Sequence, residues 1–182
     1  MNYATIKWAD VANGPGVRVS LFVSGCTHRC PGCFNGEAQD FAYGQPFTRA
    51  EEDRITAALA PAHIKGLSLL GGEPFEPDNQ RALLPLLRRI KEKYPEKEIW
   101  CYSGYTLETE LWRVSRARCE STDEMLSLID VLVDGPFIQE QKDLNLRFRG
   151  SANQRILNVP ASIQAGTAVL WDGELAIQSI TI

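Results

Sequence analysis

Residues 17–33 of this 182-residue chain have the sequence Val17-Arg-Val-Ser-Leu-Phe-Val-Ser24-Gly-Cys26-Thr-His-Arg-Cys30-Pro-Gly-Cys33. The first eight residues are rich in β-branched and apolar side chains, which predicts a buried strand at Val17–Ser24. A loop with three cysteines, spaced C-x3-C-x2-C, follows this strand at once. The segment therefore places three thiols directly after a strand of the expected core.

Strand-like apolar runs alternate with helical patterns along the rest of the chain. We expect further strands at Leu67–Leu70, Glu98–Tyr102, Asp130–Val133 and Arg155–Val159, and helices from Thr48 to Ala60, around Leu83–Ile90, and over residues 106–118 and 122–129. This alternation favours a parallel sheet with right-handed crossovers. Four or five units are too few for a closed barrel of about 250 residues. We therefore predict an α/β fold, an open partial (β/α) barrel with a mostly parallel sheet.

Three local signals refine this prediction. Thr48 and Glu51 have the spacing of a capping box, which should begin the first helix. Pro85 lies inside the next helical pattern and should kink that helix or move its start to a later residue. Ala168–Leu170 and Leu175–Ile177 flank the turn signal Asp172-Gly173, which predicts a C-terminal β-hairpin. We expect one domain over residues 1–182, with residues 156–182 as a C-terminal extension.

Composition excludes several classes of protein. With 44% hydrophobic and 23% charged residues, the chain has the composition of a globular domain. Its net charge of −4 argues against a nucleic-acid partner. No apolar run approaches the roughly 20 residues that span a bilayer, and Met1–Asp10 do not resemble a signal peptide. We therefore expect a cytoplasmic protein, in which closely spaced cysteines serve metal binding or catalysis rather than disulfides.

Polar or glycine-rich residues follow each of the predicted central strands. They are Gly25-Cys26, Gly71-Gly72-Glu73, Ser103-Gly104 and Asp134-Gly135. In open α/β sheets, ligands bind outside the carboxyl ends of the strands. The four segments therefore predict one shared site.

The cysteine spacing suits an iron–sulfur cluster or zinc, since both prefer thiolate ligands. Three cysteines would fill three corners of a four-iron cluster and leave one iron open. A structural zinc site needs a fourth protein ligand, for which His28, Cys101 and Cys119 are the candidates. We interpret Cys101 and Cys119 as small core residues and His28 as solvated or packed. The cysteine spacing alone does not decide between an iron–sulfur cluster and a zinc ion.

Two motifs together carry a resemblance to a known family. The C-x3-C-x2-C loop after one strand and Gly71-Gly72-Glu73-Pro74 after the next resemble the radical S-adenosylmethionine superfamily. Within it, Asn13-Gly14-Pro15-Gly16 and Arg149-Gly-Ser-Ala-Asn-Gln154 resemble the glycyl-radical activating enzymes that serve anaerobic ribonucleoside-triphosphate reductase. The resemblance covers about residues 2–155. Many superfamily members carry an aromatic residue before the third cysteine, where this chain has Gly32, and Phe34 follows that cysteine instead.

This resemblance implies an oxidoreductase with a [4Fe-4S] cluster on Cys26, Cys30 and Cys33 and S-adenosylmethionine as the second cofactor. An electron passing through the cluster would cleave S-adenosylmethionine to methionine and a 5′-deoxyadenosyl radical. That radical would take a hydrogen atom from a glycine of the reductase. This step requires no acid–base residue. The implied partners are the reductase and a flavodoxin-type electron donor, and the alternatives are the activation of another glycyl-radical enzyme, such as pyruvate formate-lyase, or a non-catalytic zinc-binding module.

The resemblance also implies roles for individual residues around the cysteines. Gly71, Gly72 and Glu73 would hold the methionine end of S-adenosylmethionine, and the backbone of Gly32, Cys33 and Phe34 would lie near its adenine. Ser103 and Asp134 would contact the ribose or the carboxylate. The loop from Arg149 to Arg155 would touch the cofactor or the partner. Because a glycine of a large enzyme must be reached, we expect the mouth of the site to be the protein–protein interface as well.

Overall fold

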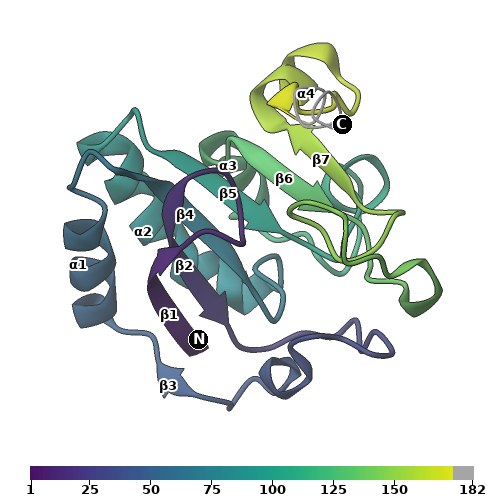
Figure 1. Cartoon of the computed structure of the whole chain (residues 1–182), viewed down its shortest axis with the longest axis horizontal. Helices are drawn as coiled ribbons and strands as arrows, with labels where there is room; N and C mark the ends of the chain where they lie inside the picture. Colours follow the sequence, from purple (N-terminus) through teal and green to yellow (C-terminus); the bar gives the residue numbers. More distant parts are fainter. Residues whose placement is uncertain (174–182) are drawn as a thin grey trace.

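The computed structural model describes residues 1–173, which form an α/β structure built on a seven-stranded sheet (Figure 1). The strand order is β3-β1-β2-β4-β5-β6-β7. The strands are β1 (Asn2–Asp10), β2 (Val17–Val23), β3 (Gln45–Pro46), β4 (Ile64–Gly71), β5 (Glu98–Tyr102), β6 (Val131–Asp134) and β7 (Arg155–Asn158). The predicted strands at the centre of the sheet are confirmed within a few residues.

The sheet is parallel in its middle and antiparallel at both sides. The four strands β2, β4, β5 and β6 pair in parallel, whereas β1 pairs with β2, and β7 with β6, in the antiparallel sense. The prediction of an open, mostly parallel sheet is confirmed. The description as a partial barrel is not, because antiparallel strands flank the parallel unit on each side and the run of strand–helix units ends there.

Helices follow the strands in chain order. They are α1 (Arg49–Ala58), α2 (Pro77–Lys93), α3 (Thr122–Leu128) and α4 (Val159–Ala165), with short turns η1 (Gly36–Gln39), η2 (Leu107–Leu111) and η3 (Gln139–Gln141). The capping box of α1 is confirmed, since Ala50 N donates to Thr48 Oγ1 at 3.2 Å and Thr48 N donates to Glu51 Oε2 at 3.1 Å.

Two helix predictions need correction. Helix α2 begins at Pro77 and continues through Pro85, so the predicted later start is wrong. The helix predicted over residues 106–118 is also wrong beyond Leu111, where one π-helical turn ends. Two side chains stop it by bonding its free carbonyl oxygens: Ser115 Oγ donates to Glu110 O at 2.7 Å, and Arg118 Nη1 donates to Leu111 O at 2.5 Å.

The core lies between the sheet and helices α1, α2 and α3. Leu69 and Cys101 from the strands pack there with Ile55, Leu87 and Met125 from the helices. The opposite face of the sheet holds a smaller cluster of Trp100, Val131, Val133 and Ile156, against which Phe148 and Trp171 pack. Burying one such large apolar side chain stabilises the fold by about 1.5–3 kcal/mol. The two layers together fix the strand ends that carry the site.

The chain beyond β7 continues the sheet only briefly. Leu170 forms an isolated antiparallel bridge with Leu157 of β7, and the rings of Trp171 and Trp100 lie 4.9 Å apart. The second strand of the predicted hairpin, Leu175–Ile177, lies outside the described residues. Among residues 1–173, no helix has the length and apolar character needed to cross a membrane.

Candidate functional site

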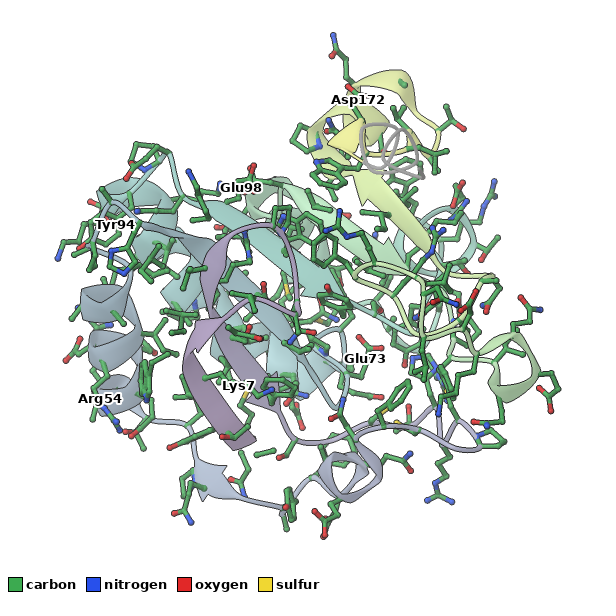
Figure 2. All side chains as sticks on the ribbon, in the orientation of Figure 1. Lys7, Arg54, Glu73, Tyr94, Glu98 and Asp172 are labelled. Carbon is green, nitrogen blue, oxygen red and sulfur yellow. The ribbon has the colours of Figure 1, made fainter. Side chains whose placement is uncertain are left out.

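A cavity of about 490 Å³ lies at the carboxyl ends of the parallel strands. It is lined by residues from all four strand-end segments of the sequence prediction: Cys26, Cys30, Cys33, Gly71, Gly72, Glu73, Ser103, Gly104 and Gly135. Glu73 stands near the middle of the molecule in this region (Figure 2). The prediction that separate segments would meet in one place is therefore confirmed for these residues.

The three cysteines line one cavity because their loop leaves β2 at the edge where the parallel strands end. Cys26 N donates to Gln39 O at 3.1 Å, and Cys33 N donates to Cys30 O at 3.2 Å, which closes the loop into a compact turn. All three thiols are half-buried and make no disulfide. The loop thus presents three soft ligands to the same space.

Burial disfavours ionisation of these thiols unless a positive partner stabilises the thiolates. It raises the pKa of Cys26 to about 12 and also raises the pKa of Cys30. A coordinated metal centre reverses this preference, because it stabilises the thiolates that bind it. Three thiols and a cavity beside them fit an iron–sulfur cluster with one iron left for another ligand.

The glycine turn after β4 is bonded directly to the start of the cysteine loop. Gly72 N donates to Val23 O at 2.7 Å, and Glu73 N donates to Gly25 O at 2.8 Å. Asn79 Nδ2 adds a bond to Ser24 O at 3.0 Å. The two motifs that the sequence separates by about forty residues therefore form one unit of backbone.

Glu73 is 1% exposed, and its carboxylate serves the protein's own structure. Oε1 accepts from Phe75 N at 2.8 Å and from Ser103 Oγ at 2.9 Å. Oε2 accepts from Gly104 N at 2.7 Å and lies 3.0 Å from His28 Nε2. Glu73 and Ser103 do line the cavity, but both side chains are engaged with each other and with the backbone.

Asp134 differs from the prediction, since it does not line the cavity. It is fully buried, and its Oδ2 accepts from Leu107 N at 2.9 Å and from Arg155 Nη2 at 2.5 Å. Arg155 also donates to Glu108 Oε2 at 2.6 Å. This network ties η2 to β6 and β7 and occupies both the Asp134 carboxylate and the Arg155 guanidinium.

The remaining predicted residues divide between the cavity and the surface. Phe34 lines the cavity, and its ring contacts Phe137 at 5.2 Å. Gly32 is exposed and lies outside the lining, against the side chain of Gln139. From the predicted loop at residues 149–155, Arg149 and Gln154 reach the cavity.

None of the candidate fourth ligands for zinc completes a site. Cys101 is fully buried in β5, and the Cys119 thiol lies beside Thr122; neither cysteine lines the cavity. His28 does line the cavity, but it is packed, one of the two outcomes predicted for it, with its ring 4.2 Å from that of Tyr105. Within residues 1–173, no three His, Cys, Asp or Glu side chains converge closely enough to hold a single metal ion.

Some cavity residues were missed by sequence reasoning. Lys7 lines the cavity from β1, a strand that was not predicted although Tyr3, Thr5 and Ile6 favour one. Asn13 lies in the loop after β1, and Tyr102 at the end of β5. Their types carry no chemical signal by themselves, so only the fold could place them here.

Comparison with known proteins agrees with this geometry. A family described as "4Fe-4S single cluster domain" matches residues 12–157. A protein of Vibrio cholerae is 49% identical over 158 residues, which is 86% of this chain and 97% of the relative. One of Escherichia coli (strain K12) is 46% identical over 156 residues, 85% of this chain and 96% of the relative. One of Enterobacteria phage T4 is 38% identical over 156 residues, 86% and 93% respectively.

All three relatives are named "Anaerobic ribonucleoside-triphosphate reductase-activating protein". The identity extends over nearly their whole length, and the family match includes the cysteine loop, the glycine turn and every central strand. The chain therefore belongs to the family of anaerobic ribonucleoside-triphosphate reductase-activating proteins and carries that family's 4Fe-4S single cluster domain.

Proposed function

We propose that this protein is a radical S-adenosylmethionine enzyme that activates anaerobic ribonucleoside-triphosphate reductase. Cys26, Cys30 and Cys33 would hold a [4Fe-4S] cluster. When bound and reduced, the cluster supplies the electron that cleaves S-adenosylmethionine to methionine and a 5′-deoxyadenosyl radical, which takes a hydrogen atom from a glycine of the reductase.

One observation carries this proposal: three thiols and the glycine turn line the same cavity, and the chain offers no fourth cysteine there. The other two cysteines, Cys101 and Cys119, lie outside the lining. Cysteines placed in this way would leave one iron of a bound cluster for an external ligand, in the cavity that Gly71 and Gly72 also line. A purely structural metal site would instead close all its positions with protein ligands.

The backbone of the turn is suited to the amino group of S-adenosylmethionine. The N–H groups of Gly72 and Glu73 are already bonded to Val23 and Gly25. The Gly72 carbonyl, by contrast, accepts no hydrogen bond from residues 1–173. We assign this oxygen to the methionine end of the cofactor, and Phe34 with the backbone of Cys33 to its adenine. Ser103 supports this site by holding Glu73, and Asp134 supports it by tying η2 to β6 and β7.

The mouth of the cavity is the proposed contact for the reductase. Phe34 and Leu144 line the cavity and are 59% and 82% exposed. Large exposed apolar side chains beside a reactive cavity are typical of a protein-binding surface. Arg155 is not part of the proposed contact with the reductase, because its guanidinium is bound to Asp134 and Glu108.

The decisive experiment uses anaerobically reconstituted protein, a reductant, S-adenosylmethionine and the reductase. We expect a brown protein and, by electron paramagnetic resonance, a glycyl radical on the reductase. Serine in place of Cys26, Cys30 or Cys33 should abolish both, whereas Cys119→Ser should change neither. Cofactor cleavage without the radical would point to another glycyl-radical enzyme, such as pyruvate formate-lyase. A colourless protein with stoichiometric zinc would contradict the proposal.

A further inference from the structure

Thr27 and His28, the two residues directly after Cys26, contact two carboxylates, one in the glycine turn and one at the start of α2. Thr27 donates to Glu76 Oε1 twice, from N at 2.8 Å and from Oγ1 at 2.6 Å. His28 Nε2 lies 3.0 Å from Glu73 Oε2. Glu73 and Glu76 are 1% and 6% exposed. The segment between two proposed cluster ligands is therefore anchored to the segment proposed to hold the cofactor.

The Glu73 carboxylate, which His28 contacts, is itself held in place by other hydrogen bonds. Three donors besides the histidine bind the Glu73 carboxylate, and they come from its own turn and from the end of β5: Phe75 N, Ser103 Oγ and Gly104 N. A buried carboxylate requires such bonds, because its desolvation is costly without them. His28 thus contacts a group whose position is fixed by two neighbouring strand ends.

The histidine ring is enclosed on its other sides as well. It packs on Tyr105 with ring centroids 4.2 Å apart, and Arg116 Nη2 lies 3.4 Å from Nδ1. With Nε2 donating to Glu73, Nδ1 is the acceptor for the Arg116 guanidinium. A Cβ at Gly104 would come within 2.7 Å of ring atoms of His28, so any side chain there would force the ring to move. Both ring nitrogens are engaged, and neither is left for a metal.

We propose that His28 is a positioning residue for the reaction: through Glu73 it sets the cluster loop against the Gly71-Gly72 turn. This inference rests on the proposed function. Without the contact, Cys26 and Cys30 could still bind a cluster, and the backbone and Thr27 bonds would still join the loop to the turn, but the cluster loop would lose the side-chain contact to Glu73 that refines its position relative to the cofactor. Groups that orient ligands in this indirect way typically contribute about 10–100-fold to affinity or activity.

The test compares His28→Leu, His28→Gln and His63→Leu in reconstituted protein. The only other histidine, His63, is exposed and makes the matched control. We expect His28→Leu to retain its iron but to bind S-adenosylmethionine about 10–100-fold more weakly. The change that the cofactor causes in the electron paramagnetic resonance spectrum of the reduced cluster should shrink in parallel. His28→Gln, whose amide can donate to Glu73, should recover most of both effects, and His63→Leu should match the wild type.

An unchanged cofactor affinity and spectrum in His28→Leu would overturn the proposal. If that variant fails to fold, Gly104→Ala provides the same test, because the added methyl group displaces the histidine ring while leaving its chemistry intact. A normal cofactor affinity and spectrum in Gly104→Ala would likewise overturn it. The proposed function fails separately, when the wild type itself neither cleaves S-adenosylmethionine nor forms the radical on the reductase.

Discussion

At Gly72 a side chain would collide with two backbone oxygens. A Cβ there would lie 2.5 Å from Gly25 O and 2.8 Å from Ala38 O, closer than van der Waals contact allows. We predict that Gly72→Ala forces the turn away from the cysteine loop, costs about 1–3 kcal/mol of unfolding free energy, and lowers S-adenosylmethionine cleavage more than tenfold. Chemical denaturation and a cleavage assay measure the two effects.

The control for this prediction is Gly36→Ala. A Cβ at Gly36 meets no atom within 4 Å, so this variant should keep wild-type stability and activity. Full activity in Gly72→Ala would show that the turn can move without harm to the cofactor, and would remove the Gly72 carbonyl from the proposed site.

At the scale of single elements, helix α2 contains Pro85 in its interior, although a proline is expected to mark the boundary of a helix. Pro85 is exposed, while its neighbours Leu84 and Leu86 are buried against the core. We predict that Pro85→Ala stabilises the protein by about 1–2 kcal/mol, because a proline inside a helix costs about 3 kcal/mol and part of that gain is lost to the freer unfolded chain. Thermal unfolding of the apoprotein measures it. A lower melting temperature would mean that α2 requires the proline.

The network around Arg155 joins η2, β6 and β7. Arg155→Ala should destabilise the protein by about 2–3 kcal/mol, less than the 3–5 kcal/mol of a fully buried pair, because the arginine is one-third exposed. The cost arises from the Asp134 carboxylate, which is left buried without its cation. Adding Asp134→Asn to this variant should recover part of the loss in urea denaturation. An additive double variant would contradict this explanation.

The elements predicted correctly are those whose signal is local. Strands β2, β4, β5 and β6 are short apolar runs that end at glycine or polar residues, and their burial gives a clear pattern. Strand β1 was missed because it lies near the sheet edge, where most of its residues stay partly exposed. The direction of β7 could not be predicted, because antiparallel pairing depends on the path of the long 135–154 connection rather than on the four residues of the strand.

The same distinction applies to the site. Three cysteines and a glycine turn signal their role through spacing and position after a strand, so their meeting in one cavity could be predicted. Asp134 also lies at the carboxyl end of a strand, but its carboxylate is bound by Arg155, a residue distant in sequence, and Asp134 does not line the cavity. The contact of His28 with Glu73 likewise joins two motifs that no local pattern connects.

At the scale of the whole molecule, some arginines form ion pairs with carboxylates and others do not. The chain carries a net charge of −4, and most of its arginines pair with carboxylates, including Arg81, Arg88 and Arg118. Arg29, in the cysteine loop, and Arg113 form no ion pair with any residue of the described part. Arg113 shares its exposed segment with Arg116, which contacts His28. Arg29 thus places a positive charge without an ion pair to the described residues in the cysteine loop, and Arg113 places another on the exposed segment that carries Arg116.

These positive charges would favour association with an acidic one-electron carrier, since complementary charge accelerates association. We predict that Arg113→Glu slows cluster reduction by such a donor roughly tenfold at low ionic strength, with a smaller effect at high salt. Arg54→Glu is the matched control: it makes the same change of charge on α1, far from Glu73 (Figure 2). Reduction by photoreduced deazaflavin, which needs no docking, should be equally fast in all three proteins. Equal rates with the protein donor as well would mean that the electron enters from another face.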